Sequence, residues 1–171
     1  VRMASFSPDG RWVVTASKDQ TARIWDAGTG TQRLVFEDHG ETLGGAAFSP
    51  DGTRVVSWSK DGEGRVWDAA TGKTAFVVQG LRWESPCAAF SPDGRRLLTV
   101  EADTVRLRES SGGAIVLDLP GGDRKPGWAL FSPDGLGLLV VPAEGEQPWV
   151  VEAASGRGVS TFQGHAAPVL A

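Results

Sequence analysis

The most reactive residue types in this chain are a histidine, a serine and an aspartate that occur within a short stretch of sequence. His39 precedes Ser59 and Asp61, and these residue types form the Ser-His-Asp triad of nucleophilic hydrolases. A hydrolase also needs an oxyanion hole or a Gly-x-Ser-x-Gly nucleophile turn, and the sequence contains no such motif. A structural hydrogen-bonded set is therefore favoured over a catalytic one.

Other residues that could do chemistry are sparse. The chain has two histidines, His39 and His165, and a single cysteine, Cys87, so it lacks the ligand spacing of a zinc site. The Gly-rich segment 121–127 has no Lys-Ser/Thr ending and no helical pattern after it, which indicates a surface loop rather than a phosphate cradle. We expect no catalytic residue, no metal and no cofactor, and we interpret Cys87 as a small packing residue.

One short string organises the whole chain. Phe-Ser-Pro-Asp-Gly begins at Phe6, Phe48, Phe90 and Phe131, at spacings of 42, 42 and 41 residues. Pro presets φ for a tight turn and Gly suits its last position. Short apolar runs surround each string, and no stretch has the periodicity of a helix. Each repeat therefore predicts four short antiparallel strands joined by tight turns.

A period of about 40–45 residues, four strands per unit and a Trp-Asp dipeptide are typical of WD-repeat β-propellers. The dipeptide occurs at Trp25-Asp26 and Trp67-Asp68, and a Gly-His dipeptide occurs at Gly164-His165. The chain resembles this family over essentially its whole length. The expected fold is all-β, a single region 1–171 of four consecutive four-stranded blades. The predicted blades are 1–42, 43–84, 85–125 and 126–168, with 169–171 starting a further repeat.

The resemblance also implies a role for the histidine set. The family has a hydrogen-bonded tetrad of Asp, His, Ser and Trp that ties the loop between blades to the inner strands. The matching residues are His39, Ser59, Asp61 and Trp67 in the second repeat, and Ser17, Asp19 and Trp25 in the first. The implied order is that Asp61 accepts from His39, His39 orients Ser59, and Ser59 meets the Trp67 indole N–H.

The third and fourth repeats depart from the family pattern. Arg108-Glu109 and Val151-Glu152 stand where Trp-Asp is expected, and Glu101 and Pro142 replace the strand serine. These two repeats are assigned by the phase of Phe-Ser-Pro-Asp-Gly.

Four blades are few for a propeller, since such rings have 4–8 blades and seven is usual for the WD-repeat family. We expect an open arc whose two ends expose apolar sheet faces. The remaining blades come from a longer parent chain or from a second copy, in which His165 would precede the partner's first blade. Residues 169–171 would compete with residues 1–3 in such a pair, which favours the parent chain.

The resemblance implies a rigid, non-catalytic platform that binds a partner protein or peptide on its loop faces. The candidate contacts are Trp83, which is the strongest, followed by Arg82, Arg124, Lys125, Lys18 and Lys60. The Trp83 ring contacts a partner or else lies over the neighbouring blade. Trp58 either fills space between blades or reaches the surface. The alternative functions are a sensory or regulatory C-terminal module of a larger bacterial signalling enzyme and, less favoured, a propeller hydrolase.

Composition narrows the partners and the source. A net charge of −4 argues against a nucleic-acid groove or a polybasic membrane surface. No apolar run approaches the roughly 18 residues that a membrane helix needs. A single cysteine favours a reducing, cytoplasmic compartment, and the absence of Tyr together with many Arg and few Lys suggests a GC-rich bacterial gene.

Overall fold

The computed structural model describes residues 1–83, 87–144 and 147–162, and their regular structure consists of β-strands. Blade 1 contains β1 (Met3–Phe6), β2 (Trp12–Ala16), β3 (Ala22–Asp26) and β4 (Gln32–Phe36). Blade 2 contains β5 (Leu43–Phe48), β6 (Arg54–Ser59), β7 (Gly64–Asp68) and β8 (Thr74–Val78). Blade 3 contains β9 (Ala88–Phe90), β10 (Arg96–Glu101), β11 (Thr104–Glu109) and β12 (Ile115–Pro120). Blade 4 contains β13 (Pro126–Phe131), β14 (Gly137–Pro142), β15 (Trp149–Glu152) and β16 (Gly158–Thr161).

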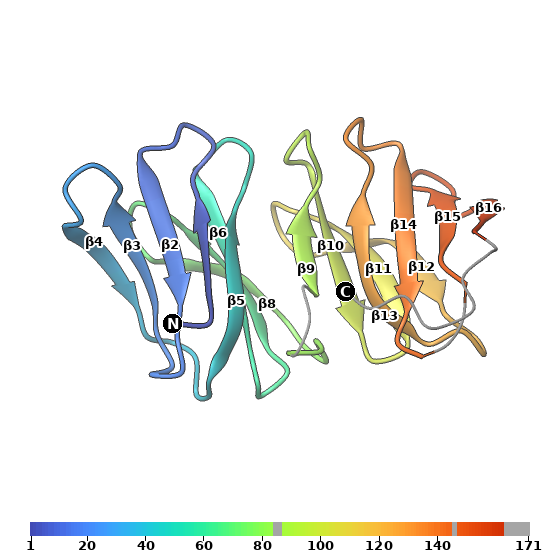
Figure 1. Cartoon of the computed structure of the whole chain (residues 1–171), viewed down its shortest axis with the longest axis horizontal. Helices are drawn as coiled ribbons and strands as arrows, with labels where there is room; N and C mark the ends of the chain where they lie inside the picture. Colours follow the sequence, from blue (N-terminus) through green and yellow to red (C-terminus); the bar gives the residue numbers. More distant parts are fainter. Residues whose placement is uncertain (84–86, 145–146, 163–171) are drawn as a thin grey trace.

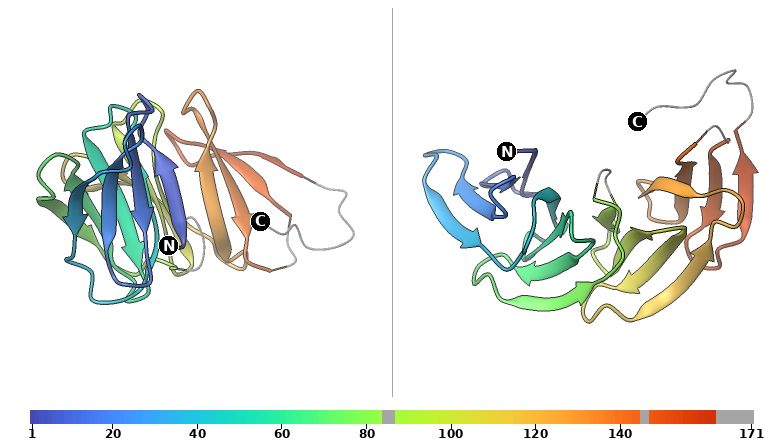
Figure 2. Two further views of the ribbon diagram at one scale, coloured as in Figure 1. Left: turned by 60° about the vertical axis from the view of Figure 1, so that its left-hand side comes forward. Right: turned by 90° about the horizontal axis from the view of Figure 1, so that it is seen from below.

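The four blades have one topology. Within each sheet the strands are hydrogen-bonded in chain order, and each neighbouring pair is antiparallel. The blades stand side by side along an open arc, with the first strand of each on the concave side and the fourth on the convex side (Figures 1 and 2). The prediction of an all-β arc of four blades is confirmed. Residues 163–171, with His165 and the expected start of a further repeat, lie outside the described residues.

Each Ser-Pro-Asp-Gly turn is held by its own serine and aspartate. In the first turn the Ser7 hydroxyl donates to Asp9 Oδ1 at 2.6 Å and accepts from the Trp12 N–H at 2.9 Å. Gly10 closes the turn at φ 70°, a left-handed conformation that favours glycine. The same serine-to-aspartate bond recurs in the other three turns. We call the edge of the arc that carries these turns the turn face, and the opposite edge, with the loops between blades, the loop face.

Apolar side chains fill the space between consecutive blades. Between blades 1 and 2, the Trp67 ring stacks on Phe36 with centroids 4.6 Å apart and planes at 4°. Both residues belong to a buried cluster drawn from both blades, and a second cluster joins blades 2, 3 and 4. The hydrophobic core therefore lies in the interfaces between neighbouring sheets.

Trp58 fills space inside the arc, which decides between the two alternatives left open by the sequence. Its side chain is 2% exposed and lies against Gly44 and Gly45 of β5. A Cβ at Gly45 would meet the Trp58 ring at 2.3 Å and Met3 at 2.6 Å. The two glycines are therefore required for close packing, because any larger residue would collide with the indole.

An arginine ties blades 2 and 3 together on the turn face. The Arg54 guanidinium, on the first residue of β6, donates to the carbonyl oxygens of Gly94, at 3.2 Å, and of Ser110. The Ser110 hydroxyl donates to the same Gly94 carbonyl at 2.6 Å. Hydrogen bonds at its edge therefore hold the interface between blades 2 and 3 together, in addition to apolar packing.

Candidate functional site

The histidine set forms a continuous hydrogen-bonded chain in blade 2. His39 lies in the loop between β4 and β5 and is 3% exposed. Its Nδ1 is 3.1 Å from Ser59 Oγ, and its Nε2 is 2.8 Å from Ser57 Oγ. The Trp67 Nε1–H donates to Ser57 Oγ at 3.1 Å, and the Ser59 hydroxyl donates to Asp61 Oδ1. The order of residues is therefore Trp67, Ser57, His39, Ser59, Asp61.

This order corrects the one implied by the family resemblance. Ser59 does not meet the Trp67 indole, and Asp61 bonds to Ser59 rather than to His39. Ser57 and Ser59 are two residues apart on β6, so both side chains point to one face of the strand, with the imidazole between them. In a catalytic triad the carboxylate accepts from the histidine and orients it toward one serine. The geometry here fits a structural tie between a loop and a strand.

Burial sets the charge of this network. Desolvation, with Arg65 nearby, lowers the pKa of His39 to about 4, so the ring is neutral at pH 7. Burial by itself would raise the pKa of Asp61, but the bonds from the Ser59 hydroxyl and the Glu63 N–H hold it below its ordinary value. A neutral histidine accepts through one nitrogen and donates through the other, which suits two serine hydroxyls.

Blade 1 contains the same network only in part. The Trp25 Nε1–H donates to Thr15 Oγ1 at 2.9 Å, and Thr15 occupies the place that Ser57 has in blade 2. Ser17 Oγ accepts from the Asp19 N–H at 3.3 Å, and Asp19 Oδ1 accepts from Thr21. Ser17 and Asp19 therefore order the turn between β2 and β3, and Trp25 contacts a hydroxyl that the predicted set did not include.

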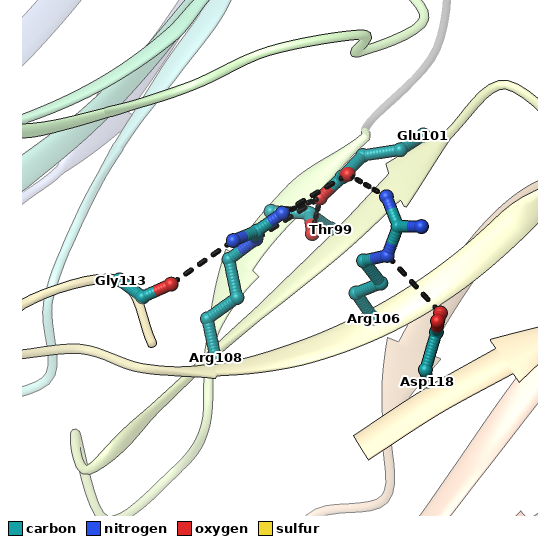
Figure 3. Close-up of polar contacts among 6 residues, drawn as sticks. All are labelled: Thr99, Glu101, Arg106, Arg108, Gly113 and Asp118. Atoms are coloured by element: carbon teal, nitrogen blue, oxygen red, sulfur yellow. Dashed lines mark hydrogen bonds and ion pairs between the residues drawn. The ribbon is translucent and has the colours of Figure 1, made fainter. Parts of the chain in front are cut away.

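In blade 3 an ion cluster replaces the network (Figure 3). Glu101, at the place of Ser59, is 4% exposed. Its carboxylate accepts from Thr99 Oγ1 at 2.6 Å, from Arg108 Nε at 3.0 Å and Nη2 at 2.8 Å, and from Arg106 Nη1. Arg106 also pairs with Asp118 at 3.0 Å. Arg108 occupies the place of Trp67 and donates to the Gly113 carbonyl at 2.9 Å. The two departures from the family pattern therefore compensate each other.

Comparison with protein families agrees with these features. The family model described as WD domain, G-beta repeat matches residues 1–26 and 30–68, which carry both Trp-Asp dipeptides. The remaining two sheets repeat the same four-strand order. Blades 1 and 2 are WD40 repeats. A search of curated protein sequences gives no significant match.

The Trp-Asp dipeptide has a local function in the turn after the third strand of blades 1 and 2. Asp68 Oδ1 accepts from the N–H groups of Ala70 at 3.1 Å and Thr71 at 2.8 Å, and from the Thr71 hydroxyl at 2.7 Å. Asp26 makes the equivalent bonds in blade 1. These bonds lower the pKa of both carboxyls, so both stay ionised and hold the turn that leads to the outer strand.

Among the candidate contacts, the structure brings Trp83 and Lys60 together. Trp83 lies half-buried in the loop between blades 2 and 3. Lys60 Nζ is 5.8 Å from the centroid of its ring, and Arg2 Cζ, from the start of blade 1, is 4.8 Å from it. Both distances suit cation–π attraction. The three residues, here called the Trp83 cluster, come from blade 1, blade 2 and the loop between blades 2 and 3, and sequence spacing gave no sign that Arg2 belongs with them.

The other candidate contacts lie elsewhere on the loop face. Arg124 lies over the Trp149 ring at 5.5 Å, and Lys125, next to it, is exposed. Lys18 is exposed in the turn between β2 and β3, and Arg82 is half-buried with its N–H directed to the Val100 carbonyl at 3.4 Å. These four residues therefore lie outside the Trp83 cluster.

No group of three or more His, Cys, Asp or Glu within 1–83, 87–144 and 147–162 is placed to hold a metal ion. In the same part of the chain no helix is long and apolar enough to cross a membrane.

Cys87 is expected to resist thiol reagents in the folded chain. It is 1% exposed, and burial raises the pKa of its thiol, whereas the thiolate is the reactive form. Iodoacetamide at pH 8 should leave Cys87 unmodified in buffer and modify it fully in urea, as measured by mass spectrometry. Rapid modification of the native protein would show that blade 3 opens around this residue.

Proposed function

We propose that this chain is a non-catalytic protein-interaction scaffold that binds an acidic peptide segment of a partner on its loop face, at the Trp83 cluster. The observation that supports the proposal is the Trp83 ring, half-buried between blades and flanked by Arg2 and Lys60 at 4.8 and 5.8 Å from its centroid. WD40 repeats are typically interaction scaffolds, which is consistent with this use of the loop face.

The chemistry of the cluster favours a partner with both carboxylates and an apolar group. Tryptophan and arginine are enriched at the few interface positions that contribute most of the binding energy. A cation above an aromatic ring retains N–H groups that point away from the ring and donate to carboxylates. A partner can therefore bind the Arg2 and Lys60 cations while its apolar side chain covers the ring. The lone buried Cys87 supports the further proposal of a reducing, cytoplasmic setting. We also propose a bacterial source, on the basis of the amino-acid composition.

A displayed peptide library, selected on the immobilised chain, tests this proposal. Selected peptides should be rich in Asp and Glu, and Trp83→Ala should weaken binding of one such synthetic peptide by about tenfold or more. The thermal midpoint should change little, because the ring is only half-buried. Isothermal titration calorimetry and differential scanning calorimetry measure the two quantities.

Trp12→Ala is the matched control for this substitution. Trp12 is also half-buried between two cations, with Arg33 at 4.3 Å and Arg11 at 5.6 Å, but it lies next to the turn face. This variant should bind the peptide as tightly as the original chain. Equal binding by the Trp83→Ala variant, or loss of binding only in the Trp12→Ala variant, would contradict the proposal.

A further inference from the structure

The interface between blades 2 and 3 holds an arginine in a slot on the turn face. The Arg54 guanidinium donates to the carbonyl oxygens of Gly94 and Ser110, and its Cζ lies 5.4 Å from the centroid of the Phe90 ring. A guanidinium has five N–H donors in a planar fork, and its plane stacks on aromatic faces. Two carbonyl oxygens beside an aromatic ring therefore form a site that fits this group, here called the arginine slot.

The interface between blades 3 and 4 has the same spacing between its turns. A Cβ at Gly94 would lie 3.7 Å from Pro50 Cδ of the preceding blade. A Cβ at Gly135 would lie 3.4 Å from Pro92 Cδ. The turns of blades 3 and 4 are therefore about as close to each other as those of blades 2 and 3.

The counterparts of the slot residues are present in blade 4. In blade 3 the Ser110 N–H donates to the carbonyl of Arg95 at 3.0 Å, and in blade 4 the Ala153 N–H donates to that of Leu136 at 2.8 Å. Arg95 and Leu136 each follow the glycine that ends the turn, so Ala153 has the place of Ser110. Phe131, which begins the Phe-Ser-Pro-Asp-Gly string of this blade, supplies the aromatic ring.

The arginine that could fill this second slot is directed elsewhere. Arg96 has the place of Arg54 in the repeat, but its Nη1 lies 3.7 Å from Glu109 Oε1 of its own blade. The carboxylate that faces Arg54 in the register belongs to Asp68, which accepts from N–H groups of its own turn. Glu109 therefore draws Arg96 away from blade 4, whereas Asp68 leaves Arg54 free to reach blade 3.

A hollow of about 340 Å³ lies at the place of this slot. Gly135, Ala153 and Phe131 line it together with residues of blade 3. Within the described residues, no side chain donates to the carbonyl oxygen of Gly135 or Ala153. Ala153 also lacks the hydroxyl that Ser110 directs to Gly94. The volume lies within the range of about 300–1,000 Å³ that is usual for ligand pockets.

The charge of the lining favours a cation. Asp93 and Asp134 both line the hollow. Bonds from the serine hydroxyl of each turn hold the pKa of both carboxyls below the ordinary value, so both are ionised at pH 7. Arg96, the third charged residue of the lining, is paired with Glu109. The two aspartates therefore leave negative charge at the hollow.

The floor and the rim of the hollow are apolar. Leu107 and Leu117 line it from blade 3, and Leu136, in the turn of blade 4, is 72% exposed. Blades 1 and 3 carry Arg11 and Arg95 at the place of Leu136, so blade 4 presents an apolar side chain where these two blades present a cation. A side chain with an aliphatic stem and a charged end matches this lining, because its stem can lie on the leucines.

We propose that the hollow between blades 3 and 4 binds an arginine side chain of a partner polypeptide, with an apolar residue of that partner beside it on Leu136. The bound guanidinium takes the place that Arg54 has between blades 2 and 3 and donates to the carbonyls of Gly135 and Ala153. Arginine fits better than lysine, because its planar fork matches two carbonyls and an aromatic ring. This site lies on the turn face, opposite the Trp83 cluster, and selects the opposite charge.

An NMR titration of the ¹⁵N-labelled chain with the acetylated, amidated peptide Leu-Arg-Leu tests the proposal. The amide signals of Gly135, Leu136 and Ala153 should shift. The same peptide with citrulline, a neutral isostere of arginine, should bind about tenfold or more weaker, because a hydrogen bond to an ionised group is stronger than one between neutral groups.

Two aspartate variants test the charge of the hollow. Asp134→Asn keeps an oxygen that can accept from Ser132 and removes the charge, so it should weaken binding of the arginine peptide by about three- to fivefold, as expected for an exposed ion pair. Asp9→Asn is the matched control, because Asp9 accepts the same bonds from Ser7 and from the N–H two residues on but lies outside the hollow. This control should bind the peptide like the original chain.

Leu136→Arg tests the rim of the hollow. Arg95 shows that the turn accepts arginine at this place, so the variant should fold normally and repel the arginine peptide. Thr53→Arg adds the same charge at the same place of blade 2 and should leave the binding unchanged. The Trp83→Ala variant should also bind this peptide normally, so the result is independent of the site on the loop face.

Three results would overturn the proposal. The first is equal binding of the arginine and citrulline peptides, and the second is an equal loss in Asp134→Asn and Asp9→Asn. The third is a set of shifted signals that does not include Gly135, Leu136 and Ala153.

Discussion

Glu101→Ala is expected to lower the free energy of unfolding by about 3–5 kcal/mol, the usual cost of removing one partner from a buried ion pair. Glu101 is 4% exposed, and Arg108, which makes three of the bonds to its carboxylate, is 14% exposed. Without the carboxylate, the Arg108 guanidinium keeps, among the described residues, the Gly113 carbonyl alone. Urea denaturation followed by tryptophan fluorescence measures the change.

Glu109→Ala is the control for the Glu101 experiment. Glu109 also pairs with an arginine in blade 3, but its distance to Arg96 is 3.7 Å and the side chains are 52% and 43% exposed. Exposed pairs contribute about 0–1 kcal/mol, so this variant should be nearly as stable as the original chain. A double variant, Glu101→Ala with Arg108→Ala, should cost less than the sum of the single changes. Equal costs for Glu101→Ala and Glu109→Ala would show that the buried cluster does not stabilise blade 3.

The sequence predicted the architecture well because repetition averages out local ambiguity. The turn that begins at Ser7 fixes the phase of one blade, and its recurrence at the same spacing fixes all four. The open arc followed from the number of repeats. These features depend on turn chemistry and strand alternation, which are local properties of the chain.

Contacts between repeats were harder to predict. The order of bonds around His39 depends on which of two serines in β6 faces each ring nitrogen, and Ser57 was not included. A signal was present, because Thr15, Ser57 and Thr99 place a hydroxyl at the same position in three repeats. Arg2 reaches Trp83 because the fold brings the start of blade 1 next to the loop between blades 2 and 3, which no spacing along the chain indicates.

Paired departures from the repeat pattern carry information that single departures do not. Glu101 and Arg108 each weaken the match of blade 3 to the family, but together they form one ion cluster. Gly44 and Gly45 likewise explain Trp58, because the missing side chains in β5 make room for the large one in β6. Compensation of this kind links residues on different strands, so it becomes visible once the register is known.

His39→Ala and Trp67→Phe are each expected to destabilise the fold by about 1–3 kcal/mol, because each removes buried hydrogen bonds from the serine hydroxyls of this network. The two residues bond to the same Ser57 hydroxyl, so the double variant should cost less than the sum. Trp25→Phe is the matched control, since Trp25 donates to Thr15 and no histidine of the described residues bonds to that hydroxyl, and its cost should be smaller. Strictly additive losses would contradict a shared network.

The same network predicts a pH dependence with a definite sign. An unfolded histidine has a pKa of 6.5, and burial lowers the pKa of folded His39 to about 4. Between these values the unfolded chain binds a proton that the folded chain does not, so stability falls as the pH drops from about 6.5 to 4 and is constant with respect to this group above 6.5. The loss over that window is about 2–3 kcal/mol. In His39→Ala the slope should flatten, because His165 is present in both proteins and its titration cancels in the comparison. Urea unfolding at pH 4.5, 5.5 and 7.5 measures how the free energy of unfolding depends on pH in both proteins. An unchanged pH dependence in the variant would show that His39 is not held neutral by the fold.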